Sequence, residues 1–228
     1  MAIVKKYLAK IEKIESEPEG IYTISFSSNK KFVFNPGQFL HLALDEYDGV
    51  GQWPESRCFS MRSSPDEDKL KITFAVKGNY TNRMANELKQ GKEVWLKMPY
   101  GDLFSQAHSL NNCVFISGGT GITPYLSLFT DSSFADYVKP VLYFGARTKQ
   151  YNIYSNDLEK AKRINPGILI QTYYEDTDGM LNIEKVFNNN GNSATYFISG
   201  PPIMIKTFKI FLLSKSIEEN KIRTDEWE

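Results

Sequence analysis

A glycine-rich turn constrains the fold of this chain more than any other part of its sequence. The turn, Ser117-Gly-Gly-Thr-Gly-Ile-Thr-Pro124, follows an apolar run at residues 113–116 and precedes an amphipathic segment at residues 125–129. This order predicts a strand, a turn and the start of a helix. The glycines allow backbone conformations closed to other residues and keep side chains away from the turn amides. We therefore expect the positive end of a helix dipole that binds the pyrophosphate of a nucleotide.

The end of the turn predicts how the helix begins. Thr123 is expected to cap the helix with its side chain, and Pro124 to take the first helical position, where no amide hydrogen is needed. Pro124 also stands where the dinucleotide-binding fingerprint has a third glycine, and residues 144–150, where the next strand should end, contain no Asp or Glu. A generic NAD-dependent dehydrogenase is therefore a poor match. A purely structural strand-helix corner stays an alternative for the turn considered alone.

Composition is compatible with a soluble enzyme of two domains. A chain of 228 residues with 41% hydrophobic content can bury one large core or two modest ones. The formal net charge of zero gives no broad attraction for nucleic acid. The first residues lack the apolar core of a signal peptide, and no apolar stretch approaches the ~18 residues of a membrane helix. We expect a cytoplasmic protein with no membrane span and no nucleic-acid partner.

The chain has too few metal ligands of the soft type for a cluster. Its only cysteines are Cys58 and Cys113, and its only histidines are His41 and His108. An iron-sulfur cluster or a structural zinc site needs about four such ligands close together, so the pattern predicts no metal centre. Any redox chemistry then requires an organic cofactor. Two reduced thiols are favoured over a disulfide, which stays an alternative.

The pattern of apolar residues changes near residue 108. Before it, short alternating segments separated by turn residues predict an antiparallel β-barrel over residues 1–108. After it, apolar strands alternate with helical stretches, which predicts a parallel sheet in an α/β nucleotide-binding domain over residues 109–228. The expected barrel strands lie near residues 21–26, 39–44, 70–76 and 94–98. The expected strands of the second domain lie near 114–116, 138–144, 168–173 and 195–198, with helices near 157–164 and 203–213.

Two segments of the barrel half carry groups that bind anions and aromatic rings. In residues 55–65, Arg57 can pair with a phosphate, Phe59 can lie on a planar ring system, and Ser60 can hydrogen-bond an atom at the ring edge. In residues 77–88, Gly78 allows close approach of the backbone and the helix begins near Thr81 or Asn82, which predicts a second anion site. A flavin would fit this set. A polar edge strand followed by a turn is the alternative for residues 55–65.

These segments, in their order along almost the whole chain, resemble the motifs of the ferredoxin-NADP reductase family. The Arg-x-Tyr-Ser motif is present as Arg57-Cys-Phe-Ser60, the Gly-x-x-Ser/Thr turn as Gly78-Asn-Tyr-Thr81, and the Gly-Gly-Thr-Gly-Ile-Thr-Pro loop without change. Two later motifs are matched by Met98-Pro-Tyr-Gly-Asp-Leu-Phe104, which we interpret as the closing turn of the barrel, and by Ser199-Gly-Pro-Pro-Ile-Met204. The chain departs from the family pattern in having Phe59 for tyrosine, Met98 for glycine and Ser199 for cysteine.

The resemblance implies an NAD(P)H-dependent flavoprotein reductase with bound FAD. FAD is favoured over FMN because two anion features in the barrel half fit a diphosphate. The electron acceptor would be a ferredoxin, a flavodoxin or an oxygenase component. Alternatives are a free-flavin reductase and a non-catalytic nucleotide-binding module. The choice between NADH and NADPH stays open, because Arg147 and Lys149 would lie near a 2'-phosphate but are also ordinary loop cations.

The same resemblance implies roles for single residues. An acid and an aromatic residue two positions later, Asp225 and Trp227, match an arrangement that related reductases place against the flavin. The residues expected to act in catalysis are Ser60, Ser199, Asp225 and Trp227. The residues expected to bind FAD or the nicotinamide nucleotide are Arg57, Cys58, Phe59, Ser60, Lys77, Gly78, Thr81, Gly119, Thr120, Gly121, Thr123, Arg147, Gly200, Pro201 and Trp227.

Overall fold

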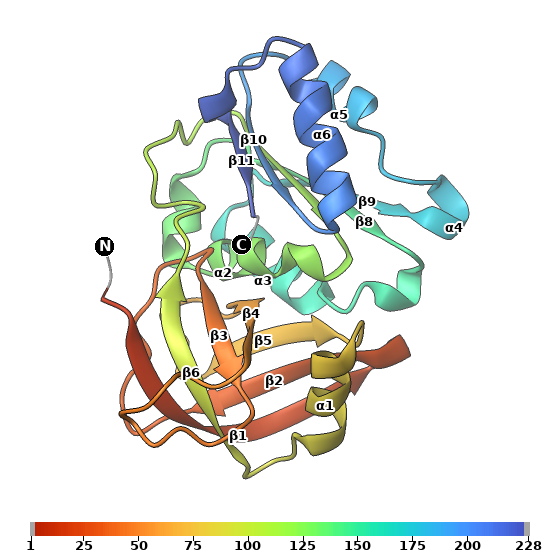
Figure 1. Ribbon diagram of the computed structural model, residues 1–228. Helices are drawn as coiled ribbons and strands as arrows, with labels where there is room; N and C mark the ends of the chain where they lie inside the picture. Colours follow the sequence, from red (N-terminus) through yellow and green to blue (C-terminus); the bar gives the residue numbers. More distant parts are fainter. Residues whose placement is uncertain (1–2, 226–228) are drawn as a thin grey trace.

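The computed structural model describes residues 3–225, which form a barrel domain and an α/β domain stacked on each other (Figure 1). The barrel is a six-stranded antiparallel sheet in the order β4-β3-β6-β1-β2-β5. A bridge between Met61 and Ile72 brings its two edges together. The strands are β1 Lys5–Glu17, β2 Ile21–Ser27, β3 Phe39–Ala43, β4 Ser56–Ser60, β5 Leu70–Ala75 and β6 Glu93–Tyr100, and the helix of this half is α1 Asn79–Glu87.

The barrel confirms the four expected strands and adds two, β1 and β4, of which β4 lies in the segment where a polar edge strand was the alternative. Strand β1 pairs with both β2 and β6, so it lies in the middle of the sheet. Only Tyr7, Ala9 and Ile11 of β1 are fully turned into the barrel core, and lysines and glutamates fill most of its outer positions. This composition weakens the apolar alternation, which is why the sequence pattern did not indicate β1.

The last barrel strand, β6, ends two residues later than the sequence predicts. Residues Met98, Pro99 and Tyr100, which we interpreted as part of a turn, belong to strand β6. Met98 is fully buried in the barrel core. The chain leaves the barrel at Gly101, whose φ of +84° lies in the left-handed region that favours glycine. The turn therefore begins three residues after the start of the motif.

The second domain confirms the expected parallel sheet, with strands in the order β11-β10-β7-β8-β9. Helices α2 and α3 pack on one face and α5 and α6 on the other, each over its own apolar core. The strands are β7 Cys113–Gly118, β8 Val141–Ala146, β9 Leu169–Tyr174, β10 Thr195–Ser199 and β11 Ile222–Thr224. The helices are α2 Thr123–Phe129, α3 Ser155–Ile164, α4 Glu175–Asp178, α5 Ile183–Asn190 and α6 Pro202–Ser214. Short 3-10 turns are Pro18–Gly20, Gly119–Ile122, Ser132–Asp136, Lys149–Tyr151 and Glu219–Lys221.

Candidate active site

Three of the expected catalytic residues meet between the two domains. Ser60 ends strand β4 of the barrel, Ser199 ends strand β10, and Asp225 directly follows β11. The Asp225 carboxylate accepts a hydrogen bond from the Ser199 hydroxyl at 3.0 Å and from the Ser60 hydroxyl at 3.4 Å. Both serines are almost fully buried. We call Ser60, Ser199 and Asp225 the interdomain cluster, and it joins residues that are 165 positions apart in the chain.

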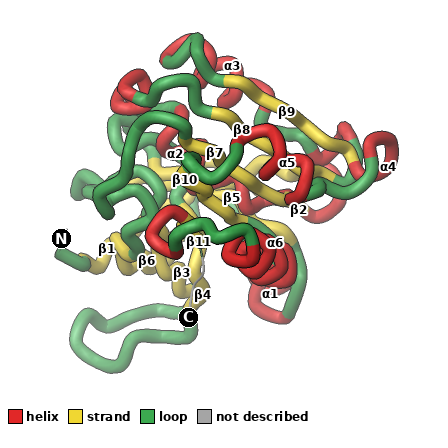
Figure 2. Tube along the Cα trace, turned by 90° about the horizontal axis from the view of Figure 1, so that it is seen from above, coloured by secondary structure: helices red, strands yellow, loops and turns green. Residues whose placement is uncertain are grey.

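The backbone around Asp225 fixes the position of its carboxylate. Its amide donates to the Ile198 carbonyl at 3.0 Å and so continues the parallel pairing of β10 with β11 by one residue. Two views of the fold place this end of the described chain beside β3 and β4 of the barrel (Figures 1 and 2). The fourth expected catalytic residue, Trp227, lies outside the described residues.

Ser117 is a polar residue of this region that the sequence analysis did not single out. It is fully buried and pairs in register with Ser199 on the neighbouring strand β10. Its hydroxyl has no hydrogen-bond partner within residues 3–225. An unpaired buried hydroxyl is unusual, because burial of a polar group without a hydrogen bond is costly. Its place at the start of the glycine turn was the sequence signal that could have indicated it.

The glycines of the turn serve two different purposes. Gly119 is exposed, has a φ of +56°, and an added Cβ would meet no atom within 4 Å, so the turn is open to a ligand there. A Cβ on Gly121 would instead lie 2.4 Å from the Cα of Gly200 in the β10–α6 turn. Gly121 is thus required for the contact between two turns. Thr120 lies between these glycines, and Pro201 is exposed directly after Gly200.

The expected side-chain cap of helix α2 is wrong. Thr123 is itself the first residue of α2 and Pro124 the second, because a 3-10 turn at Gly119–Ile122 leads into the helix. The Thr123 hydroxyl donates to the Thr120 carbonyl at 2.9 Å, and the residue is 3% exposed. Thr123 therefore stabilises the turn through its hydrogen bond to Thr120, and its buried side chain is not presented to a ligand.

The expected anion groups of the barrel lie close to each other. Arg57 lies over the ring of Tyr80, with its guanidinium carbon 4.9 Å from the ring centre, and Tyr80 belongs to the first turn of α1. Arg57 is also paired with Glu55 at 2.9 Å, and both side chains are about half exposed. This geometry places a guanidinium beside a helix N-terminus, a combination that favours a phosphate.

The Thr81 side chain is half-buried and hydrogen-bonds the backbone of the turn that precedes the helix. Its hydroxyl oxygen accepts hydrogen bonds from the amides of Lys77 at 2.9 Å and Gly78 at 3.1 Å. It donates in turn to the Gly78 carbonyl. An added Cβ on Gly78 would meet nothing within 4 Å, so the approach to the helix N-terminus is open. The hydroxyl of Thr81 is thus already used within the turn, so an anion would be bound by the backbone amides at the start of α1.

Phe59 and Cys58 lie on opposite faces of strand β4, as successive residues of a strand do. Phe59 is 8% exposed and packs edge-on against Phe74 in the barrel core, with ring centres 6.1 Å apart, so little of its ring is left for a ligand. The Cys58 sulfur lies 3.6 Å from His41 Nε2. Burial raises the pKa of the Cys58 thiol, although nearby Arg57 opposes this, so the thiol stays protonated at neutral pH.

Charged residues of both signs surround the carboxyl ends of strands β8 and β9. Arg147 follows β8 and is exposed, with its guanidinium carbon 5.9 Å from the centre of the Tyr151 ring. Its carbonyl accepts a hydrogen bond from the Asp176 amide at 3.2 Å. Asp176 belongs to α4, which also carries Glu175 and Asp178. The dinucleotide-binding fingerprint has its acid at the end of the second strand of the sheet. The acids of α4 follow the third strand, β9, and the sequence pattern therefore did not indicate them.

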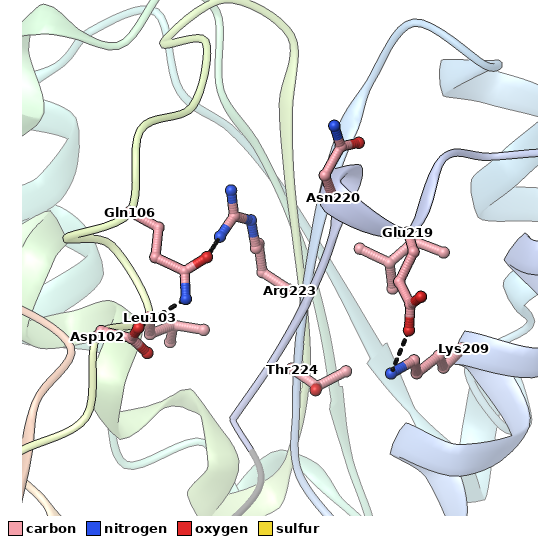
Figure 3. A pocket seen from close by; sticks show the side chains of 9 residues that line it. Asp102, Leu103, Gln106, Lys209, Glu219, Asn220, Arg223 and Thr224 are labelled. Carbon is pink, nitrogen blue, oxygen red and sulfur yellow. Dashed lines mark hydrogen bonds and ion pairs between the residues drawn. The ribbon is translucent and has the colours of Figure 1, made fainter.

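A separate pocket of about 310 Å³ lies beside the edge strand β11 (Figure 3). Arg223 donates hydrogen bonds to the Gln106 side chain and the Ala107 carbonyl on one side, and Lys209 pairs with Glu219 on the other. None of the expected site residues lines this pocket, so it is distinct from the interdomain cluster. In residues 3–225 no helix is long and apolar enough to cross a membrane, and no group of three or more His, Cys, Asp or Glu side chains could hold a metal ion.

Comparison with known proteins defines the class of the chain. Residues 115–209 match the family model of the oxidoreductase NAD-binding domain. The whole fold superposes on a ferredoxin NADP+ reductase from Neisseria gonorrhoeae, solved with bound FAD and NADP, with a TM-score of 0.81 over 99% of both chains at 18% identity. The chain therefore has the two-domain ferredoxin-NADP reductase fold.

Curated relatives agree with this class. The chain is 26% identical to a flavohemoprotein of Rhizobium meliloti, over 83% of this chain and 51% of the relative. It is 31% identical to the glycine betaine monooxygenase reductase subunit of Pseudomonas aeruginosa, over 70% of this chain and 44% of the relative. The chain thus spans about half the length of the curated relatives it matches. These similarities and the shared fold show that the chain resembles ferredoxin-NADP reductases.

Proposed function

We propose that this protein is an oxidoreductase that uses bound FAD to take a hydride from NADH or NADPH and passes electrons to a separate acceptor. The observation that carries the proposal is the interdomain cluster. Ser60, from the strand with the arginine–serine motif, and Ser199, from the nucleotide-binding sheet, donate to one carboxylate, Asp225. Ligands of parallel α/β sheets bind at the carboxyl ends of the strands, which is where this cluster lies.

The residues of the barrel fit a dinucleotide flavin. Arg57 and the N-terminus of α1 are adjacent, and an open Gly78 leads to the helix amides. Two neighbouring anion-binding features favour the diphosphate of FAD over the single phosphate of FMN. FAD, when bound, supplies the chemistry that accepts two electrons together and releases them singly or together. Cys58 would border it from β4 and Lys77 from the turn before α1, while Phe59 packs on the opposite face of β4 in the barrel core.

The nicotinamide nucleotide would bind at the glycine turn. Gly119 and Thr120 would approach its pyrophosphate, and Gly200 and Pro201 would border the nicotinamide beside them. The interdomain cluster would orient the nicotinamide through its hydroxyls and hold a proton in a region from which water is excluded. Trp227 would cover the flavin until nicotinamide displaces it, as the resemblance implies.

The electron acceptor would be a separate protein. The reductase subunit of glycine betaine monooxygenase is named as part of an oxygenase system, which supports an oxygenase component, a ferredoxin or a flavodoxin as the acceptor class. A free-flavin reductase is the second candidate. The exposed position of Arg57 and its competing pair with Glu55 would allow flavin to exchange. Flavin that remains with the protein through purification would favour a bound cofactor over a substrate.

The test is a visible spectrum of the purified protein followed by anaerobic stopped-flow reduction with NADH and with NADPH. We expect a flavin spectrum that bleaches with at least one nucleotide. Asp225→Asn keeps the size of the side chain but removes the negative charge to which Ser60 and Ser199 donate. The change should slow reduction of the flavin by about tenfold or more, because the nicotinamide is less well oriented. A colourless protein that binds nucleotide would support a non-catalytic module, and a flavin that neither nucleotide bleaches would refute the proposal.

A further inference from the structure

The end of strand β4 and the residues that follow it also hold the two domains together. We call residues 60–64 the interdomain segment. Beyond the Ser60 contact, the Ser63 carbonyl accepts a hydrogen bond from the Ser127 hydroxyl of α2 at 2.8 Å. The Ser64 hydroxyl donates to the Asp131 carboxylate at 2.9 Å. All four of these side chains are buried, so both contacts are shielded from water.

Arg62 is the charged residue of this segment, and its guanidinium reaches both domains. One terminal nitrogen donates to the hydroxyls of Thr23 and Thr73, each at 2.9 Å, on barrel strands β2 and β5. The other donates to the Asp157 carboxylate at 2.6 Å, in the first turn of α3. The Arg62 side chain is only 11% exposed and that of Asp157 22%. The ion pair between the domains is thus largely removed from solvent.

The surroundings of Arg62 leave it little freedom. Its guanidinium carbon lies 5.0 Å from the centre of the Tyr154 ring, and Tyr154 is 1% exposed. Thr23 and Thr73 are also hydrogen-bonded to each other, so the barrel end of the contact is fixed as well. An ammonium is a point charge whose donors have no fixed geometry, whereas a planar guanidinium donates in fixed directions while stacking flat on a ring. Its fixed fork therefore holds α3 at one position relative to β2 and β5.

We propose that Arg62 is a positioning residue that fixes the barrel relative to the nucleotide-binding sheet, and thereby aligns the nicotinamide of the bound nucleotide with the flavin. The proposal rests on the proposed function. Arg62 lies two residues after Ser60 of the interdomain cluster, so a shift at one is transmitted to the other along a single short segment. Misplacement of reacting groups by about 1 Å can lower a rate by about 100-fold.

The test compares Arg62→Met, Arg62→Lys and Asp157→Asn. Methionine keeps the apolar stem, lysine keeps the charge without the fork, and asparagine removes only the negative charge of the partner on α3. Lys160→Met is the matched control. Lys160 lies on the same helix and pairs with Glu67 of the barrel half at 3.3 Å, but it is 43% exposed and should contribute little. Flavin content, nucleotide affinity and the rate of flavin reduction at saturating nucleotide are measured for each variant.

We expect Arg62→Met and Asp157→Asn to slow reduction by about 10- to 100-fold while nucleotide affinity changes by less than about twofold. The double variant should be no slower than Arg62→Met, because both changes break the same link. Arg62→Lys should recover part of the rate, and Lys160→Met should match the unmodified protein. Unchanged reduction rates in both Arg62→Met and Asp157→Asn would overturn the proposal. If Arg62→Met loses its flavin or unfolds, the milder Asp157→Asn decides.

Hydrogen exchange separates this proposal from the proposed function. In the protein as isolated, without nucleotide, amides of the interdomain segment and of the first turns of α3 should exchange faster in Arg62→Met and Asp157→Asn than in Lys160→Met. This readout needs no electron transfer. An unmodified protein that neither nucleotide reduces would refute the proposed function, while equal exchange in all variants would refute the link through Arg62.

Discussion

At the scale of single residues, Arg57, which we propose binds a phosphate, already lies beside a helix N-terminus without a ligand. Arg57 lies on the Tyr80 ring beside the start of α1 and is paired with Glu55. Because both side chains are about half exposed, that pair contributes little to stability and can be exchanged for a phosphate at small cost. The contact with the Tyr80 ring places the Arg57 guanidinium beside the first turn of α1.

The first prediction concerns this arginine. Arg57→Ala should lower FAD affinity by about 1.5 to 3 kcal/mol, the size of a charge-assisted hydrogen bond. Fluorescence titration of the flavin-free protein measures the change. Glu55→Gln is the matched control, since it removes only the competing carboxylate and should leave FAD affinity equal or tighter. If both variants bind FAD as the unmodified protein does, Arg57 does not contact the cofactor.

At the scale of elements, the β7–α2 turn and the β10–α6 turn pack against each other through glycines. Gly121 approaches Gly200 so closely that a side chain at position 121 would overlap with the backbone of the β10–α6 turn. Gly119, two positions earlier, faces open space. Gly121 is therefore needed for the packing of the two turns, whereas the space beside Gly119 is open to a ligand. The sequence motif alone does not distinguish these two glycines.

A pair of alanine substitutions tests this division. Gly121→Ala should lower the free energy of unfolding by about 2 kcal/mol or more, because its methyl group would overlap with backbone atoms. Gly119→Ala should lower it by about 1 kcal/mol through its left-handed backbone alone, while weakening nucleotide binding more clearly. Urea unfolding and nucleotide titration measure the two effects. The reverse order of stability losses would show that the turns do not pack as described.

At the scale of the whole molecule, a formal net charge of zero leaves nucleotide selection to local charges. Arg147 and Lys149 follow β8, three acids of α4, Glu175, Asp176 and Asp178, follow β9, and the Asp176 amide donates to the Arg147 carbonyl. The ribose of a dinucleotide lies near the end of the second strand, where an acid favours a hydroxyl and a cation favours a 2'-phosphate. Three carboxylates beside two cations should therefore disfavour the phosphate.

We accordingly predict that NADH is preferred over NADPH by about tenfold or more in kcat/KM, equivalent to about 1.4 kcal/mol. Steady-state reduction of an artificial acceptor by the two nucleotides measures the ratio. The double variant Glu175→Gln/Asp176→Asn should raise activity with NADPH and leave activity with NADH nearly unchanged. A preference for NADPH in the unmodified protein would contradict this account of the charges.

The sequence alone determined the features that depend on near neighbours in the chain. The alternation of apolar residues predicted most strands of both halves, and the glycine turn predicted the junction of β7 with α2. Residue types that bind phosphate also identified the regions of Arg57 and Gly78 as two separate candidate anion sites. These inferences succeed because strand burial and turn geometry are set mainly by residues within a few positions of each other.

Only the tertiary structure decided which distant residues meet. The interdomain cluster, the ion pair of Arg62 with Asp157 and the contact of Gly121 with Gly200 each join segments whose distance depends on strand order and on how the domains pack. The Thr123 hydroxyl was expected to cap α2 but donates to the Thr120 carbonyl, because a 3-10 turn that the motif does not indicate precedes the helix. Such contacts follow from the closing of long loops and the packing of whole faces, and no local pattern in the sequence records them.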